Sequence, residues 1–229
     1  MQLSQSIPFV LALGLLIGCQ STDNKYNAKP TKIDDGLLTY ASAEARADVT
    51  AARTNFAVAE DELAGARLRL TEAKKRREVA IGMRSVAREQ VEVAEATAKS
   101  LDTDLTVEGD AMSTEQALAE LDIADERIAV HDREIELRQQ QVELRDAEVN
   151  LARAKVNLAK ANAVANIDRP IADEINVAAF ESAVRSAETD VQVARTRVEA
   201  ADNEFVRMQD QFDGDLATLK DMREEMMDK

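Results

Sequence analysis

The chain has 229 residues, of which 45% are hydrophobic, 32% charged and only 3% aromatic. This apolar fraction is too high for simple disorder, and the shortage of aromatic side chains argues against a thick globular core. A formal net charge of −15 repels phosphate backbones and anionic lipid headgroups, so direct nucleic-acid binding is not expected. The abundance of Ala, Val, Leu, Glu, Arg and Asp is typical of long helices and coiled coils.

The first feature along the chain is an apolar run over residues 7–17, IPFVLALGLLI, which is followed closely by the single cysteine, Cys19. A membrane-spanning helix needs about 20 such residues, whereas the core of a secretory signal needs about 7 to 15. The length therefore favours a signal peptide over residues 1–18. The start MQLSQS has no Lys or Arg, which departs from the usual signal pattern. The alternative is a short buried helix with an ordinary core cysteine.

The run ends in Leu16-Ile17-Gly18-Cys19, which resembles the lipobox of bacterial lipoproteins. The resemblance implies signal cleavage between Gly18 and Cys19, a diacylglyceryl group on the Cys19 thiol, and a further acyl chain on the new amino terminus. Two or more acyl chains give stable membrane anchoring without a spanning helix. Gln20 lacks the Asp that retains many Gram-negative lipoproteins at the inner membrane. The resemblance thus implies the periplasmic face of the outer membrane, with the outer face of the inner membrane as the alternative.

Residues 19–36 are polar and contain Pro30, which indicates a flexible tether. A first helix is predicted over 37–101, because Ala recurs every seven residues from Ala45 to Ala94 beside a second apolar ladder. Spacings of three and four produce one coiled-coil seam. Arg77 and Arg84 interrupt the larger-residue ladder around Gly82. This interruption predicts either a local register shift or two arginines that extend out of the seam.

The first break covers residues 102–112, after which Ser113 and Gln116 form a candidate helix cap. A second helix is predicted over 114–166. It carries apolar residues on two sides, which favours burial between two neighbours.

Asn166 and Pro170 then mark the second break, and a third helix is predicted over 170–227, with a soft spot at Gly214 and Asp215. Short connections make consecutive helices antiparallel. The expected fold is therefore all-α, an elongated antiparallel three-helix coiled-coil bundle over 37–229. The alternative keeps helices two and three continuous, with a kink at Pro170.

Residues that could carry chemistry are few. His131 is the only histidine, and Glu134 is the only carboxylate at helical spacing from it, which is too little for a metal site. One His and a lipid-modified Cys exclude Ser-His-Asp and Cys-His sets, and no glycine-rich phosphate loop is present. Met222 and Met226 fit the apolar seam. We therefore expect no enzyme activity, cofactor, metal or small-molecule substrate.

Two classes of function fit this pattern. The first is an envelope spacer or interaction scaffold, whose plan resembles that of murein lipoproteins: lipid-anchored periplasmic coiled coils with a terminal lysine joined to peptidoglycan. That resemblance makes Lys229 a candidate attachment residue. The second is an accessory component of a transport or efflux assembly, because residues 142–161 look like the Ala and Leu repeat of efflux hairpins. A periplasmic chaperone is a third alternative. Expected partners are the membrane, through the acyl chains, and an envelope protein or a second copy, with residues 102–112 as the preferred contact region.

Overall fold

The computed structural model describes residues 32–101 and 113–227, which form three long α-helices and two short 3-10 helices. The described residues contain no strand, so the fold is all-α as predicted. The long helices have 59, 52 and 51 residues, which correspond to lengths of about 75 to 90 Å. In chain order the elements are η1 (Asp35–Tyr40), α1 (Ala43–Leu101), α2 (Thr114–Ala165), η2 (Pro170–Glu174) and α3 (Val177–Met227).

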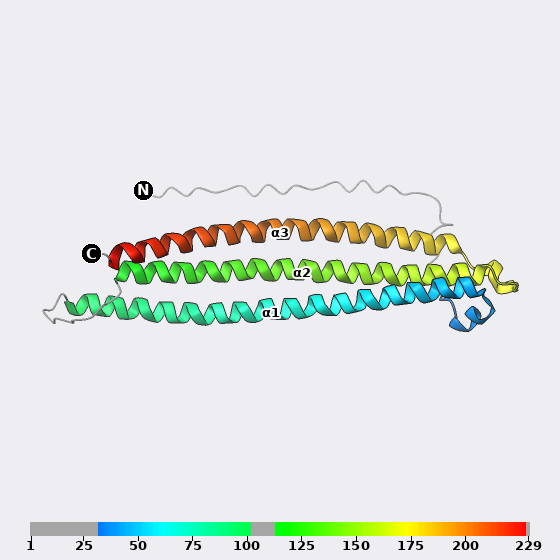
Figure 1. The fold of residues 1–229 in the computed structure, drawn as a ribbon, viewed down its shortest axis with the longest axis horizontal. Coiled ribbons are helices and arrows are strands. Elements are labelled where there is room, and N and C mark those ends of the chain that lie inside the picture. The colour runs from blue at the N-terminus through cyan, green and yellow to red at the C-terminus, as the bar shows by residue number, and fades with distance from the viewer. Residues whose placement is uncertain (1–31, 102–112, 228–229) are drawn as a thin grey trace, which may run out of the picture.

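The three long helices lie side by side as an elongated rod, with α2 antiparallel to both neighbours (Figure 1). This confirms the predicted architecture. The alternative of one continuous helix kinked at Pro170 is wrong, because α2 ends at Ala165 and the chain reverses before α3 begins. Arg169 has extended backbone angles, and Pro170 then opens η2. A fixed proline φ suits this first helical position.

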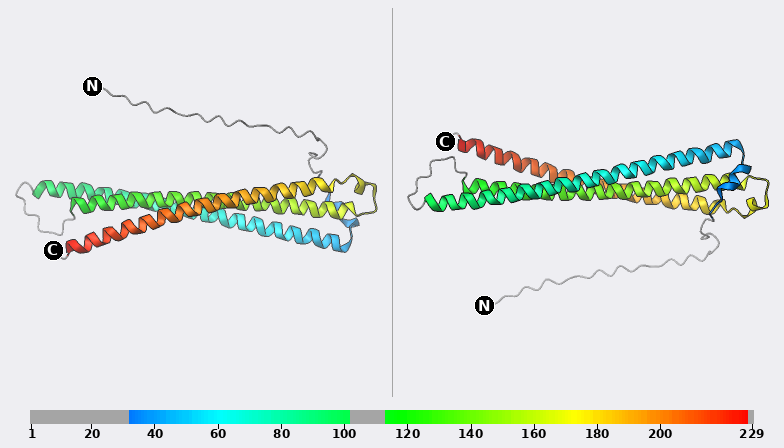
Figure 2. Two further views of the ribbon diagram at one scale, coloured as in Figure 1. Left: turned by 90° about the horizontal axis from the view of Figure 1, so that it is seen from above. Right: turned by 90° about the horizontal axis from the view of Figure 1, so that it is seen from below.

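The helices form an open layer rather than a closed bundle. Helix α2 packs along both α1 and α3, whereas α1 and α3 have no comparable packing with each other. The layer is twisted, so that α1 and α3 cross each other in projection on opposite sides of α2 (Figure 2). The two apolar sides predicted for α2 are therefore both buried, while α1 and α3 each have one side turned away from α2.

Small side chains occupy the contact between α1 and α2. Ala66, Ala73 and Ala80 recur every seven residues, and their exposed fractions are 2%, 0% and 1%. Because side-chain size sets the distance between helix axes, alanine allows α1 and α2 to approach closely. Helix α1 continues through Arg77 and Arg84, and the alanine register is unchanged beyond them.

No register shift therefore occurs at these arginines. Both leave the seam and form ion pairs with α2, Arg77 with Asp132 and Arg84 with Asp125. Helix α3 is likewise continuous through Gly214.

Polar caps define where the helices begin. Ser113 Oγ accepts a hydrogen bond from the backbone N–H of Gln116 at 3.1 Å, as the sequence predicts. Ser42 and Asn176 cap α1 and α3 in the same way. These two caps explain why α1 and α3 begin several residues later than residues 37 and 170, since a capped N-terminus sets the first turn.

The residues that precede α1 fold onto the body. Ile33 and Leu38 are each 8% exposed and belong to an apolar cluster with Val164 and Phe180. Asp35 forms an ion pair of 2.6 Å with Lys160. Residues 33–36 therefore belong to the helical body and not to the predicted tether.

Candidate functional site

The residues predicted to carry lipid and envelope attachment, Gly18, Cys19 and Lys229, lie outside the described residues, as does the predicted contact region 102–112. Within the described ranges, no helix has the length and apolarity that a membrane span requires. Four features of the helical body remain as candidates for function: a buried carboxylate, a carboxylate cluster, a groove and an apolar stripe.

The buried carboxylate belongs to Glu134, which is 7% exposed near the middle of α2. Arg76 of α1 donates two hydrogen bonds to it, one of them from Nε to Oε2 at 3.2 Å. His131 Nδ1 lies 3.3 Å from the same Oε2, and an Arg138 nitrogen lies 3.7 Å from Oε1. The spacing of four residues between Glu134 and Arg138 is typical of an ion pair on an exposed helix face, and the prediction of exposure that this spacing gives is wrong for Glu134.

The surroundings of Glu134 control its charge. Burial alone would raise the pKa of Glu134, but hydrogen bonds from Arg76 and His131 and the charges of Arg76 and Arg138 lower it below 4.5. The carboxylate is therefore ionised at neutral pH and ties α1 to α2. This arrangement is a structural ion-pair cluster, because Arg76 donates a hydrogen bond to each carboxylate oxygen of Glu134.

The carboxylate cluster joins α2 and α3 towards the end of the rod where α3 terminates. Burial raises the pKa of Glu126 above 4.5, and the negative charges of Asp215 and Asp122 raise it further. Glu126 Oε2 is buried without a hydrogen-bond partner among the described residues. No group of three or more His, Cys, Asp or Glu residues in the described ranges has an arrangement that could hold a metal ion.

The groove lies over α2, between α1 and α3, near the same end of the rod. Met83 and Val86 contribute from α1, Ile123 from α2 and Leu216 from α3. Arg127 stacks over the ring of Phe212, with 5.6 Å between the guanidinium carbon and the ring centroid. The groove is a consequence of the open layer, because α1 and α3 do not close over α2.

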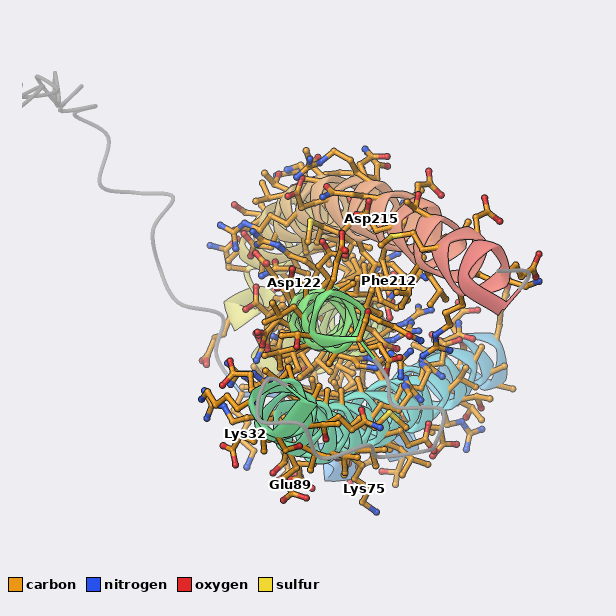
Figure 3. The ribbon with its side chains drawn as sticks, turned by 90° about the vertical axis from the view of Figure 1, so that its left-hand side faces the viewer. Lys32, Lys75, Glu89, Asp122, Phe212 and Asp215 are labelled. Carbon is orange, nitrogen blue, oxygen red and sulfur yellow. The ribbon has the colours of Figure 1, made fainter. Side chains whose placement is uncertain are left out.

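The apolar stripe runs along an exposed side of α1 and borders the groove at Val86. Val79, Val86 and Val93 recur every seven residues with exposed fractions of 59%, 55% and 65%. In the end view of Figure 3, Lys75 and Glu89 extend from the side of α1 that faces away from α2. Sequence reasoning missed the stripe because it followed only the ladders that become buried, although the seven-residue recurrence of valine was visible.

Comparison of the chain with protein families, curated proteins and solved structures found no match. The motif at Cys19 and the geometry of the rod are therefore the guides to its function.

Proposed function

We propose that the protein is a lipid-anchored envelope rod, which acts as a structural spacer or interaction scaffold. The observation that carries the proposal is the combination of Leu16-Ile17-Gly18-Cys19 after an apolar run with a body made of three long antiparallel helices. A short apolar run fits export better than a membrane span. Acylation at Cys19 would then attach the rod to a membrane surface.

The geometry supports a spacer. Element η1, which follows the proposed tether, lies at one end of the rod, and α3 ends at the other (Figure 1). A protein anchored through Cys19 would thus present the last turns of α3 at a distance from the anchor that the helix length sets. With 1.5 Å per residue, that distance is about 80 Å.

Mass spectrometry of the membrane fraction tests the anchor. The expected result is a lipid-modified peptide that begins at Cys19. Cys19→Ser is expected to release the protein from the membrane or to leave the signal peptide attached. An unmodified chain that retains Met1 in normal cells would contradict the proposal.

Membrane fractionation tests the location. We propose the periplasmic face of the outer membrane because Gln20 lacks the inner-membrane retention signal that Asp provides at this position in many lipoproteins. Gln20→Asp is expected to move the protein to the inner-membrane fraction, whereas Gln20→Asn, which adds no charge, serves as the matched control. If the native protein already fractionates with the inner membrane, this placement is wrong and the anchor itself is still open to the first test.

A further inference from the structure

The exposed side of α1 that carries Val79, Val86 and Val93 has the spacing of a second coiled-coil seam. Alternating steps of three and four residues connect positions 68 to 96 on this side, and alternating spacings of this kind form a continuous interface along a helix. Leu68 is 61% exposed, and the three valines of the stripe are also more than half exposed. We call this seam the outer stripe; its residues are Leu68, Glu72, Lys75, Val79, Gly82, Val86, Glu89, Val93 and Ala96.

Gly82 lies at the middle of the outer stripe, and packing within one copy of the chain does not explain a glycine there. A Cβ added at Gly82 would meet no atom within 4 Å among the described residues, apart from its own helix backbone. Glycine weakens a helix interior relative to alanine, so its place in an otherwise alanine-rich helix is unexplained by packing inside the rod. A glycine between Val79 and Val86 does allow another helix to approach α1 closely.

The charges of the outer stripe select the direction of such a helix. Lys75 and Glu89 lie seven residues on either side of Gly82. In an antiparallel pair of α1 helices, with Gly82 of each copy opposite Gly82 of the other, Lys75 of each copy comes opposite Glu89 of the other. A parallel pair would place Lys75 against Lys75 and Glu89 against Glu89. Opposite charges across an interface favour one arrangement and like charges oppose the other.

We propose that a second copy of this chain docks on the outer stripe, with the two α1 helices antiparallel and Gly82 at the centre of the contact. The interface is isologous, since the same residues of both copies form it. This self-association goes beyond the proposed function, because a single rod could also act as a spacer. The groove lined by Met83, Val86 and Leu216 shares Val86 with the outer stripe and is a competing place for a second helix. The Leu216 variant described below separates the two.

Zero-length carbodiimide cross-linking of the purified full chain tests the contact directly. The expected product joins the Lys75 amine to the Glu89 carboxylate. Within one copy these residues are separated by about 21 Å along the helix, so a zero-length product joins two copies. Absence of this product overturns the proposed contact. The cross-link reports contact between two copies and does not depend on acylation of Cys19. A negative result is therefore distinct from a failure of the lipid anchor.

A matched pair of glycine variants tests whether the contact needs close approach of the two helices at Gly82. Gly82→Gln and Gly214→Gln both place a neutral side chain at a helical position where a Cβ has open space. Both are expected to fold, and only Gly82→Gln is expected to lose the cross-link. If Gly82→Gln retains it, or if Gly214→Gln loses it equally, the proposed contact is wrong. Leu216→Gln, in the groove, is expected to leave the cross-link unchanged; its loss would point to the groove instead.

An exchange of the charges at Lys75 and Glu89 tests whether the two α1 helices are antiparallel. Two differently tagged full-length copies are captured through one tag, and the other tag is measured. Lys75→Glu and Glu89→Lys are each expected to reduce capture, and the double exchange is expected to restore it. A parallel pair would show no such restoration, so reduced singles without recovery in the double variant, or singles with no effect, would overturn the antiparallel arrangement.

Discussion

The carboxylate of Glu134 accepts hydrogen bonds from Arg76 and has His131 and Arg138 beside it. Because its pKa is lowered in the folded state, the ionised form stabilises the fold above pH 4.5, and this stabilisation is lost as the pH falls through the folded-state pKa. Glu134→Gln is expected to lower the free energy of unfolding at neutral pH by about 1 to 3 kcal/mol. Urea denaturation at neutral and acidic pH measures this, and the difference from the native chain should shrink as the pH falls.

Glu136→Gln is the matched control for that prediction. Glu136 lies on the same helix with 53% of its side chain exposed, paired with Arg133 at 2.8 Å. Exposed pairs contribute about 0 to 1 kcal/mol, so this variant should be close to native. Equal losses in both variants would mean that burial of Glu134 has no special effect.

Glu126 changes the stability of the fold with pH in the opposite direction to Glu134. Its pKa is raised by burial and by Asp215 and Asp122, so the contribution of Glu126 to stability is greatest at low pH and is lost as the pH rises from 4.5 through the raised value. Glu126→Gln is expected to raise the free energy of unfolding at neutral pH by about 0.5 kcal/mol. Denaturation at pH 4 and pH 7 should show a gain at pH 7 only; a loss at pH 7 would contradict the argument.

At the scale of the element, the contact between α1 and α2 depends on small side chains. Ala73 is fully buried there, and Ala73→Leu adds volume where the helices approach closely. Overpacking of this kind costs about 1 to 3 kcal/mol. Thermal unfolding is expected to show that loss for Ala73→Leu and no loss for Ala64→Leu, since Ala64 is exposed on the same helix. Similar losses at both positions would indicate a helix-propensity effect instead.

The long helices were predictable because seven-residue recurrence persists through each of them, as the buried alanines of α1 illustrate. Their starts were less predictable. Serine and asparagine occur at many positions, and only tertiary contacts decide that Ser42 and Asn176 act as caps. The burial of Glu134 also lay beyond sequence reasoning, because Arg76 is 58 residues away along the chain and its contact depends on the register of two helices. The motif proposed for lipid attachment differs from Glu134, because consecutive residues form it and the sequence alone reveals it. The described residues do not include this motif.

At the scale of the whole molecule, the sequence predicted the number and direction of the helices from Ser113, Asn166 and Pro170. It did not predict the open layer. Two apolar sides on α2 require two neighbours, but they leave undecided whether those neighbours also touch each other. Only the structure shows that α1 and α3 lack such packing.

We expect that the rod can be shortened without a change in the register of its seams. Removal of residues 56–69, 140–153 and 187–200 takes two heptads from facing parts of all three helices, so the remaining residues keep their register. The shortened chain is expected to fold, and small-angle scattering should show a maximum dimension smaller by about 20 Å. Removal of 187–200 alone is the control, because α1 and α2 keep their length and the rod should not shorten. Failure of the three-part deletion to fold would mean that the seams are not interchangeable along the rod.

The described chain starts at one end of the rod and α3 ends at the other (Figure 1). Tension applied between these two ends would act parallel to the helix axes. Both helix–helix contacts would then be loaded in shear, and the buried layers along α2 would resist together, whereas a pull on two neighbouring ends would separate the layers one after another. Since forced unfolding is governed by the unfolding rate, the zigzag path of the chain makes this rod better suited to bear tension along its length than a hairpin held at its open end.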